Sequence, residues 1–242
     1  MESITLDEMS GIRLMDRIDM KFVSSISVLP QLLDEMLPYF KVQEVDNQRI
    51  SSYATQYLDT SGLEMFVMHQ NGKLNRQKVR IRSYVDSNLS FLEVKNKNNK
   101  GRTRKMRVPV NMTHINSVND LGDERCFLDE NSIFQTSGLK PTLANEFERI
   151  TLVNDRKTER ITIDIHLSFY NYQTKCKEIL DNMMILELKQ DGWQQSDFRD
   201  ILNRLRIKQF SFSKYCMGTV LTNPDVKYNR FKGRWTLINK II

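Results

Sequence analysis

The sequence predicts an α+β fold in which an antiparallel sheet or barrel is combined with a few helices. Seven or eight short segments, rich in β-branched and aromatic residues, follow one another with only short turns between them. Helical periodicity occurs in two places, so the chain does not alternate strand and helix as a parallel βαβ fold would. The glycine motifs GxGxxG and GxxxxGK[ST] are both absent, which excludes a Rossmann or a P-loop phosphate site.

The expected elements follow from local pattern. A first strand is expected around residues 17–22. A helix is predicted over residues 27–39, because Val28, Leu32 and Met36 share one helical face and Pro30 lies in the first turn, where its missing N–H costs little. Further strands are expected at 53–59, 76–84, 91–97, 102–110, 143–153, 159–167 and 183–189. A second helix is predicted to begin after Ser196 as N-cap and to end near Gln209.

Composition indicates one folded domain over residues 1–242, with 40% hydrophobic and 27% charged residues. The net charge of +6 is unevenly placed. Residues 73–107 contain 12 basic and 2 acidic residues, which leaves 24 basic and 28 acidic residues in the rest of the chain. Because the positive charge is local, it points to a specific anion site rather than to a generally basic surface.

The cysteines and the apolar stretches suggest a soluble protein of the cytoplasm. Cys126, Cys176 and Cys216 are odd in number and show no CxxC spacing, which is typical of reduced thiols. The first residues lack the apolar core of a signal peptide. No apolar run approaches the roughly 20 residues of a membrane helix. The three histidines, far apart in the sequence, have no metal-ligand spacing.

Charged residues share one face on several expected strands. Four cations fall on one face of the strand 76–84, and these are Arg76, Lys78, Arg80 and Arg82. Mixed charge opposite apolar residues recurs in three other strands, in the sets Arg17, Asp19 and Lys21; Glu93, Lys95 and Lys97; and Glu187 and Lys189. One such strand alone fits a solvated outer face. If the sheet closes with its apolar faces against helices outside, the charged faces line a closed antiparallel β-barrel tunnel.

Such a tunnel suits a polyanion. The triphosphate of a nucleotide is bound by Arg and Lys around its oxygens and by carboxylates that hold a divalent metal on them. Phosphoryl transfer depends mainly on positioning and on charge neutralisation. A Ser, His and Asp nucleophilic arrangement is therefore not needed, and the sequence shows none.

Eight motifs occur in an order that resembles the catalytic domain of the vacuolar transporter chaperone (VTC) polyphosphate polymerases. They are Arg17-x-Asp19-x-Lys21-Phe22, Tyr53 to Asp59 with His69, Arg76 to Arg82, Leu92-Glu-Val-Lys95, Glu148-Arg149, Arg160-x-Thr-x-Asp164, Leu186-Glu-Leu-Lys189 and Phe212-Ser-Lys-Tyr215. The resemblance spans about residues 17–218. It implies the triphosphate tunnel fold, with about eight antiparallel strands and helices outside.

The resemblance implies transfer of the ATP γ-phosphate to a growing polyphosphate chain with Mn²⁺ or Mg²⁺ as metal. Together with the strand faces it assigns catalytic roles to Lys21, Arg80, Arg82, Lys95 and Lys189. Substrate-binding roles fall to Arg17, Arg76, Lys78, Arg149, Arg160 and Lys214. The metal-binding carboxylates would be Glu187 and, more weakly, Glu93.

Two departures from related proteins bear on function. The wider tunnel superfamily often opens with ExExK, and here Arg17-x-Asp19-x-Lys21 takes that place, which disfavours a hydrolytic triphosphatase. Eukaryotic polymerases of the family are joined to membrane domains, so coupling to transport would require a separate membrane partner.

The alternatives are a triphosphatase with the same fold and a non-catalytic binder of polyphosphate, nucleotide or RNA. RNA and other nucleic acids are disfavoured, because no aromatic residue interrupts the basic residues 76–82. The oligomeric state stays open.

Overall fold

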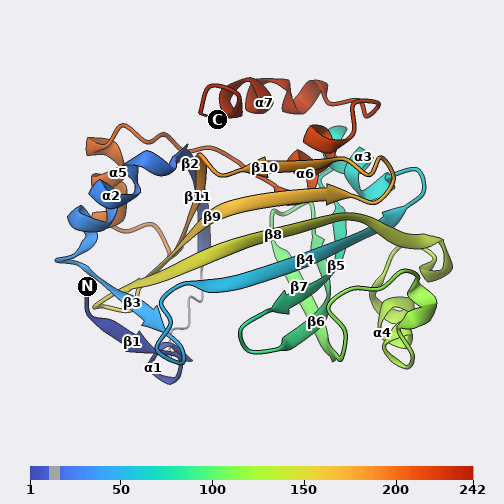
Figure 1. Cartoon of the computed structure of the whole chain (residues 1–242), viewed down its shortest axis with the longest axis horizontal. Coiled ribbons are helices and arrows are strands. Elements are labelled where there is room, and N and C mark those ends of the chain that lie inside the picture. The colour runs from blue at the N-terminus through green and yellow to red at the C-terminus, as the bar shows by residue number, and fades with distance from the viewer. Residues whose placement is uncertain (11–16, 242) are drawn as a thin grey trace.

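A computed structural model describes residues 1–10 and 17–241 of the chain. A large antiparallel sheet runs through the molecule, with the helices set around it (Figure 1). The strands are β1 (Ser3–Thr5), β2 (Arg17–Ser25), β3 (Phe40–Glu44), β4 (Ser51–Thr60), β5 (Arg76–Tyr84), β6 (Leu89–Lys97), β7 (Thr103–Val110), β8 (Leu139–Asn154), β9 (Glu159–Asn171), β10 (Lys177–Leu180) and β11 (Met183–Asp191).

The helices are short, and they join or cover the strands. The α-helices are α1 (Leu6–Ser10), α2 (Leu29–Met36), α3 (Glu64–Gln70), α4 (Glu124–Asn131), α5 (Asp197–Arg204), α6 (Lys214–Thr222) and α7 (Lys232–Ile238). The 3₁₀ turns are η1 (Ile26–Val28), η2 (Val118–Asp120), η3 (Thr136–Gly138) and η4 (Asn229–Phe231).

The sheet is open, so the prediction of a closed β-barrel is wrong. Its continuous path is β2-β11-β9-β8-β4-β5-β6-β7, with β1, β3 and β10 added beside it. Within the described ranges β2 and β7 do not pair with each other. The edge of β2 is instead met by the segment after α5, where Phe22 forms a bridge with Gln209 and the Phe210 N–H donates to the Lys21 carbonyl at 2.7 Å. The chain that follows α5 therefore occupies the edge that closure would need.

The eight strands expected from sequence are the eight strands of this continuous path. The strand β5 has the expected bounds, whereas β8 and β9 extend further than predicted. The two expected helices are present: α2 buries Leu32 and Met36, and Ser196 caps α5 by accepting from the Arg199 N–H at 3.2 Å.

The apolar face of the sheet forms the core. On the β5–β6 side, Val79, Ile81, Leu92 and Val94 are completely buried, and burial of each aliphatic side chain contributes about 1.5–3 kcal/mol. On the β2–β11–β9 side, a second apolar cluster packs beneath α2 and α5, with Phe198 of α5 buried in it. The polar positions between these residues consequently point to the opposite face.

The sheet curls strongly around its polar face. Five steps separate β2 from β5 in the strand order, and at about 4.8 Å per step a flat sheet would hold these strands about 24 Å apart. However, Lys21 of β2 donates to the carbonyl of Phe212 at 3.3 Å, and Lys78 of β5 donates to the hydroxyl of Ser213 at 2.9 Å. Since these partners are consecutive residues, the two strands face each other across the polar side of the sheet.

Candidate functional site

The inner side of the curled sheet gathers eight basic side chains, which we call the cationic face. Its members are Lys21, Lys78, Arg80, Arg82, Lys95, Arg149, Lys189 and Lys214. They come from β2, β5, β6, β8, β11 and the first residue of α6. The charges of these residues act on one another, as the pKa shifts described below show. All eight were expected from sequence as catalytic or substrate-binding residues.

The register between neighbouring strands, and the alternation of side chains along each strand, bring these residues to one face of the sheet. Along β5, the positions between the four basic residues are buried, and the basic residues themselves are half-buried. Arg80 lies opposite Glu93 in β6, and Lys21 lies opposite Glu187 in β11. Because a strand repeats every two residues, one register fixes all charged side chains of a strand on the same face.

Three carboxylates pair with part of this charge. Glu93 is 1% exposed and accepts hydrogen bonds from Arg80 Nε at 2.8 Å and Lys105 Nζ at 3.2 Å. Burial would raise the pKa of Glu93, but Arg80, Arg82 and Lys105 outweigh it and lower the pKa to about 2. The Glu93 carboxylate is therefore ionised and held as part of the wall.

Asp164 and Glu187 form the other two ion-pair clusters. Arg149 donates to both carboxylate oxygens of Asp164, at 2.6 and 2.9 Å, and Lys214 donates to the same carboxylate. Burial opposes the charge of Asp164, but Arg149 and Lys214 hold its pKa well below the usual range. Glu187 accepts from Lys189 at 2.9 Å, and its other oxygen lies 3.7 Å from Lys21 Nζ. Burial is likewise outweighed by these lysines, which lower the Glu187 pKa.

The pairing leaves an excess of positive charge. Five of the eight cations on the cationic face lie within ion-pair distance of Glu93, Asp164 or Glu187, whereas Lys78, Arg82 and Lys95 have no carboxylate at that distance among the described residues. Arg82 has no carboxylate within ion-pair distance among the described residues, and its Nε is buried without a hydrogen-bond partner. Burial, together with Arg80 and Arg149, lowers the Arg82 pKa to about 10. The guanidinium lies over the ring of Tyr53 at 5.9 Å, which does not satisfy the Nε–H. A buried donor without an acceptor is costly, so the Nε–H marks a place for an anion.

Three lysines show the same electrostatic strain. Burial and the neighbouring cations lower the pKa of Lys78 to about 8, that of Lys95 to about 8 and that of Lys214 to about 7. Lys78 and Lys95 have no carboxylate within ion-pair distance among the described residues, and Lys214 shares Asp164 with Arg149. An anion with several charges would supply negative charge and return these pKa values toward the ordinary range.

The N-terminus of α6 borders the cationic face. Ser213 is its N-cap: the hydroxyl accepts from the Cys216 N–H at 3.3 Å and also receives the hydrogen bond from Lys78. Lys214 lies over the ring of Phe147 at 4.0 Å. Neither α6 nor the role of Ser213 was foreseen, because α6 is buried almost all around and lacks the apolar stripe that identifies a helix in a sequence.

Three expected site residues lie at the ends of the strands. Arg76 begins β5 on the same face as Lys78, and Arg160 lies in β9 opposite Lys189. Arg17 begins β2, where the backbone pairs with Asp191. Lys105 was not expected to reach Glu93, although the alternation of Thr103, Lys105 and Arg107 in β7 was the signal that could have found it.

Glu187 is better suited than Glu93 to hold a metal ion. Among the described residues, no three His, Cys, Asp or Glu side chains are grouped so that they could hold one. The contact of Glu187 with Lys21, at 3.7 Å, is too long for a hydrogen bond and leaves lone pairs available. Both oxygens of Glu93 are already engaged. Because Mg²⁺ usually takes one or two carboxylates together with substrate phosphates and water, a single glutamate on a phosphate site is a suitable donor set.

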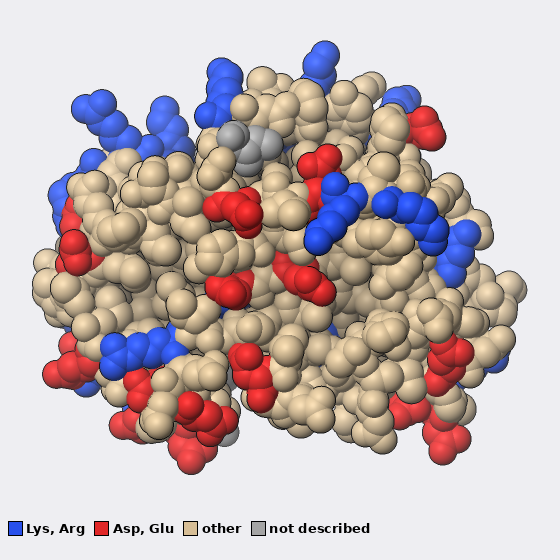
Figure 2. Space-filling view, viewed as in Figure 1, with Lys and Arg blue, Asp and Glu red and all other residues tan. Residues whose placement is uncertain are grey.

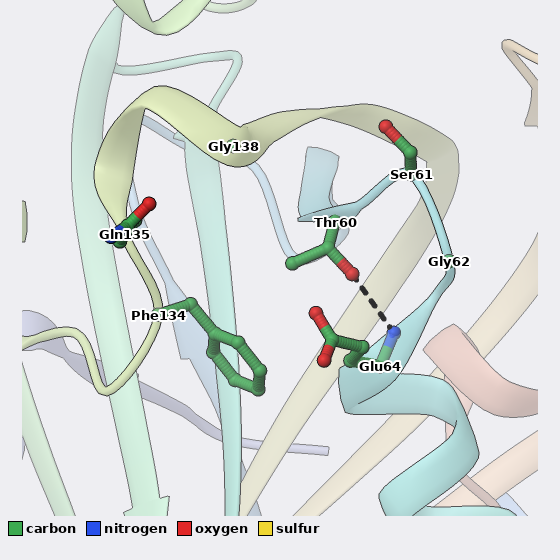
Figure 3. A pocket seen from close by; sticks show the side chains of 7 residues that line it. All are labelled: Thr60, Ser61, Gly62, Glu64, Phe134, Gln135 and Gly138. Carbon is green, nitrogen blue, oxygen red and sulfur yellow. Dashed lines mark hydrogen bonds between the residues drawn. The ribbon is translucent and has the colours of Figure 1, made fainter.

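The pockets of the outer surface lie apart from these charges. A pocket of ≈ 380 Å³ is lined by Thr60, Ser61, Gly62, Glu64, Phe134, Gln135 and Gly138, none of them basic (Figure 3). The dashed bond there, in which the Thr60 hydroxyl accepts from the Glu64 N–H at 3.1 Å, belongs to the start of α3. In the view of Figure 2, Asp and Glu side chains lie over the middle of the molecule. This face of the molecule thus carries side chains of both signs of charge.

The fold and the site define a class of protein: anion-binding proteins built on a curled antiparallel sheet whose inner face is rich in lysine and arginine. The model of one family, the VTC domain, matches residues 16–223. The chain therefore belongs to the VTC domain family, and the resemblance drawn from its motifs is confirmed. No curated protein sequence matches the chain.

Two solved structures share the fold. A putative adenylate cyclase from Bacillus halodurans has a TM-score of 0.50 at 15% identity, covering 82% of this chain and 96% of that one. A putative adenylyl cyclase from Hippeastrum, described as having a dominant triphosphatase activity, has a TM-score of 0.50 at 13% identity, covering 88% and 100%. At these identities the likeness concerns the fold alone. No helix of the described ranges is long and apolar enough to cross a membrane.

Proposed function

We propose that this VTC domain is a polyphosphate polymerase that transfers the γ-phosphate of ATP to a growing polyphosphate chain. The observation that carries the proposal is the cationic face, where Lys78, Arg82 and Lys95 have no carboxylate within ion-pair distance, and the buried Arg82 Nε has no hydrogen-bond partner, among the described residues. Such an excess of buried charge fits a linear polyanion better than a single phosphate. Membership of the VTC domain family supports the same substrate class.

The proposed reaction needs positioning and charge neutralisation. A terminal oxygen of the polyphosphate chain attacks the γ-phosphorus, the bond from that phosphorus to the β–γ bridging oxygen breaks, and ADP leaves. Arg80 and Arg82 would hold phosphate oxygens from β5, and Lys21 and Lys214 would hold them from the opposite wall. Fixed cations stabilise the charge that builds up on the transferred group and on the leaving ADP. The lysines and arginines bind the two anions in line, which offsets the repulsion between them.

A divalent metal fits beside Glu187. When bound, Mn²⁺ or Mg²⁺ neutralises phosphate charge and polarises the γ-phosphoryl group. Glu187 would supply the protein ligand. Lys189 and Lys21 would orient its carboxylate, because they contact its two oxygens from either side. The Glu93 carboxylate would instead hold Arg80 in position.

A triphosphatase is the second candidate. The structure from Hippeastrum, which shares the fold, is described as having a dominant triphosphatase activity. The same cations could bind a triphosphate while water replaces the polyphosphate end as nucleophile. The two reactions differ in products, and they can therefore be separated directly.

The test is incubation of the purified chain with ATP and either Mn²⁺ or Mg²⁺, followed by phosphorus NMR. Interior phosphate signals with matching ADP support the polymerase. Orthophosphate alone supports the triphosphatase. ATP that binds tightly and stays intact leaves the chain as a binding module, and the polymerase proposal is then wrong.

A further inference from the structure

The C-terminal segment 224–242 lies beyond the family match, which ends at residue 223. Its basic residues outnumber the one acidic residue, Asp225, and they are Lys227, Arg230, Lys232, Arg234 and Lys240. In Figure 1 this segment passes from α6 to α7 along one edge of the molecule, and Figure 2 shows Lys and Arg side chains projecting from that edge.

The C-terminal segment packs against the rest of the protein through η4. Phe231 is completely buried, with its ring 6.0 Å from that of Phe66 and 5.6 Å from that of His69. With its amide oxygen turned toward η4, the buried Gln70 accepts from the backbone N–H groups of Asn229 and Arg230 at 3.1 and 3.2 Å. These contacts attach η4 to α3, the helix that precedes β5.

The packing of η4 on α3 also fixes the positions of Arg230 and Arg234. The guanidinium of Arg230 lies so close to the turn after α3 that a Cβ at Gly72 would come within 2.7 Å of its Cζ. Gly72 also has a φ of +71°, which glycine adopts without strain. The guanidinium of Arg234 lies 5.5 Å from the centre of the Phe231 ring. Both arginines thus sit near the start of β5.

Their charge is continuous with that of Arg76 and Lys78. Burial lowers the His69 pKa to about 3, and the next causes are Lys78, Arg76, Arg234 and Arg230 in that order. The pKa of Arg234 is lowered by burial and then by Arg230 and Arg76. Among the described residues, no carboxylate lies within ion-pair distance of Arg76, Arg230 or Arg234. The row of cations along β5 therefore continues beyond Arg76, on the side where the strand begins.

We propose that Arg76, Arg230 and Arg234 form an outer anion subsite, which holds phosphates of a linear polyphosphate chain beyond those held on the cationic face. Strand residues are about 3.3 Å apart, so Arg82 and Arg76 lie about 20 Å apart along β5. A triphosphate is too short to reach from one to the other, whereas a longer chain spans them. This inference rests on the proposed function and adds chain-length recognition to it.

The test compares two polyanions on three proteins by isothermal titration calorimetry at one fixed ionic strength. The polyanions are tripolyphosphate and a long polyphosphate of tens of units. The proteins are the unmodified chain, the double variant Arg230→Gln with Arg234→Gln, and the control Lys232→Gln with Lys240→Gln. The control loses the same charge from the same segment at two exposed positions.

The arginine variant is expected to bind long polyphosphate roughly three- to tenfold more weakly, the loss of two ion pairs near the surface, and to bind tripolyphosphate as before. The control should bind both as the unmodified chain does. Equal weakening in the two double variants would overturn the subsite, since diffuse charge would explain it, and so would no weakening in either. Failure of the unmodified chain to bind tripolyphosphate would instead overturn the proposed function.

Discussion

Arg80 and Arg82 show how two like residues on one strand face acquire different tasks. Arg80 lies opposite Glu93 and is bound to it, so part of its charge is neutralised within the protein. Arg82 lies two residues further along and has no carboxylate partner among the described residues, and its Nε is buried and unpaired. The first arginine is therefore structural as well as electrostatic, and the second is free to meet a substrate.

Substitution of each arginine distinguishes a role in stability, for Arg80, from a role in substrate binding, for Arg82. Arg82→Gln is expected to abolish most ATP turnover while leaving the melting temperature unchanged or higher, because it removes repulsion with Arg80 and Arg149. Arg80→Gln leaves the buried Glu93 without its arginine partner, with Lys105 as the remaining hydrogen-bond donor among the described residues, and we expect a loss of about 3 kcal/mol in the free energy of unfolding. Urea denaturation of both variants measures this difference, and a larger loss for Arg82→Gln would contradict it.

The sequence predicted the residues of the cationic face through alternation, but not how they pair. Which cation meets Glu93 depends on the register between β5, β6 and β7. Similarly, Asp164 receives Arg149 from the neighbouring strand and Lys214 from a helix 50 residues further along the chain. Alternation is a local property, whereas pairing depends on contacts between distant segments.

At the scale of elements, α6 determines where Lys214 lies. The helix packs directly on the sheet because Gly218 presents no side chain: a Cβ there would clash with the ring of Phe169 and lie 2.7 Å from Cδ2 of Leu143. This close approach sets the depth of the whole helix, and with it the position of its first residue, Lys214, beside Asp164.

Gly218→Ala is expected to lower the free energy of unfolding by about 1–3 kcal/mol, the usual cost of overpacking a core. It should also weaken ATP binding, because α6 must shift away from β8 and β9. Gly233→Ala in α7 is the matched control, since no atom of the described residues lies within 4 Å of a Cβ there. That control should be neutral or stabilising by up to about 1 kcal/mol. Thermal melting and ATP titration of both variants provide the check, and equal effects would refute the packing argument.

The elements were predictable to the extent that they carry a periodic pattern. All eight strands of the continuous path and the helices α2 and α5 have such a pattern. The elements β1, β3 and β10, and the helices α3, α6 and α7, are short or are buried without one amphipathic side. Their placement comes from tertiary contacts, such as those of Phe231 with α3, which local sequence does not record.

For the whole molecule, the crowded lysines predict an unusual dependence of stability on pH. Lys78, Lys95 and Lys214 have folded pKa values of about 8, 8 and 7, lowered by burial and by neighbouring cations. In the unfolded chain a lysine titrates near 10.4. Above pH 7 these three lysines therefore bind more protons in the unfolded state than in the folded state, so their contribution to the free energy of unfolding rises with pH.

We expect the melting temperature to be higher at pH 9 than at pH 7. Tripolyphosphate at pH 7 should also raise it, and saturating tripolyphosphate should shrink the difference between the two pH values, because the bound anion keeps the lysines protonated. Calorimetric scans with a reducing agent, with and without tripolyphosphate, measure both effects. A melting temperature that falls steadily from pH 7 to 9 would contradict the assignment of these three lysines.

Closure of the sheet was the part of the architecture that strand patterns could not decide. Alternating charged and apolar residues occur equally in a closed barrel and in a curled open sheet, because each has one face inside and one face against the helices. The difference lies in what meets the outer strands, and here Gln209 and Phe210 pair with β2. That pairing involves residues nearly 190 positions apart in the chain.

An open sheet also leaves strand edges that could join those of another molecule. On the β2 side the incoming Phe210 already uses a backbone carbonyl of the strand. On the other side, β7 carries Arg104, Lys105 and Arg107 together with Pro109, which has no N–H to donate. Like charges and a proline are common means of preventing edge-to-edge association. The β7 edge thus carries, in its positive charge and its proline, two features that disfavour pairing with a strand of a second copy.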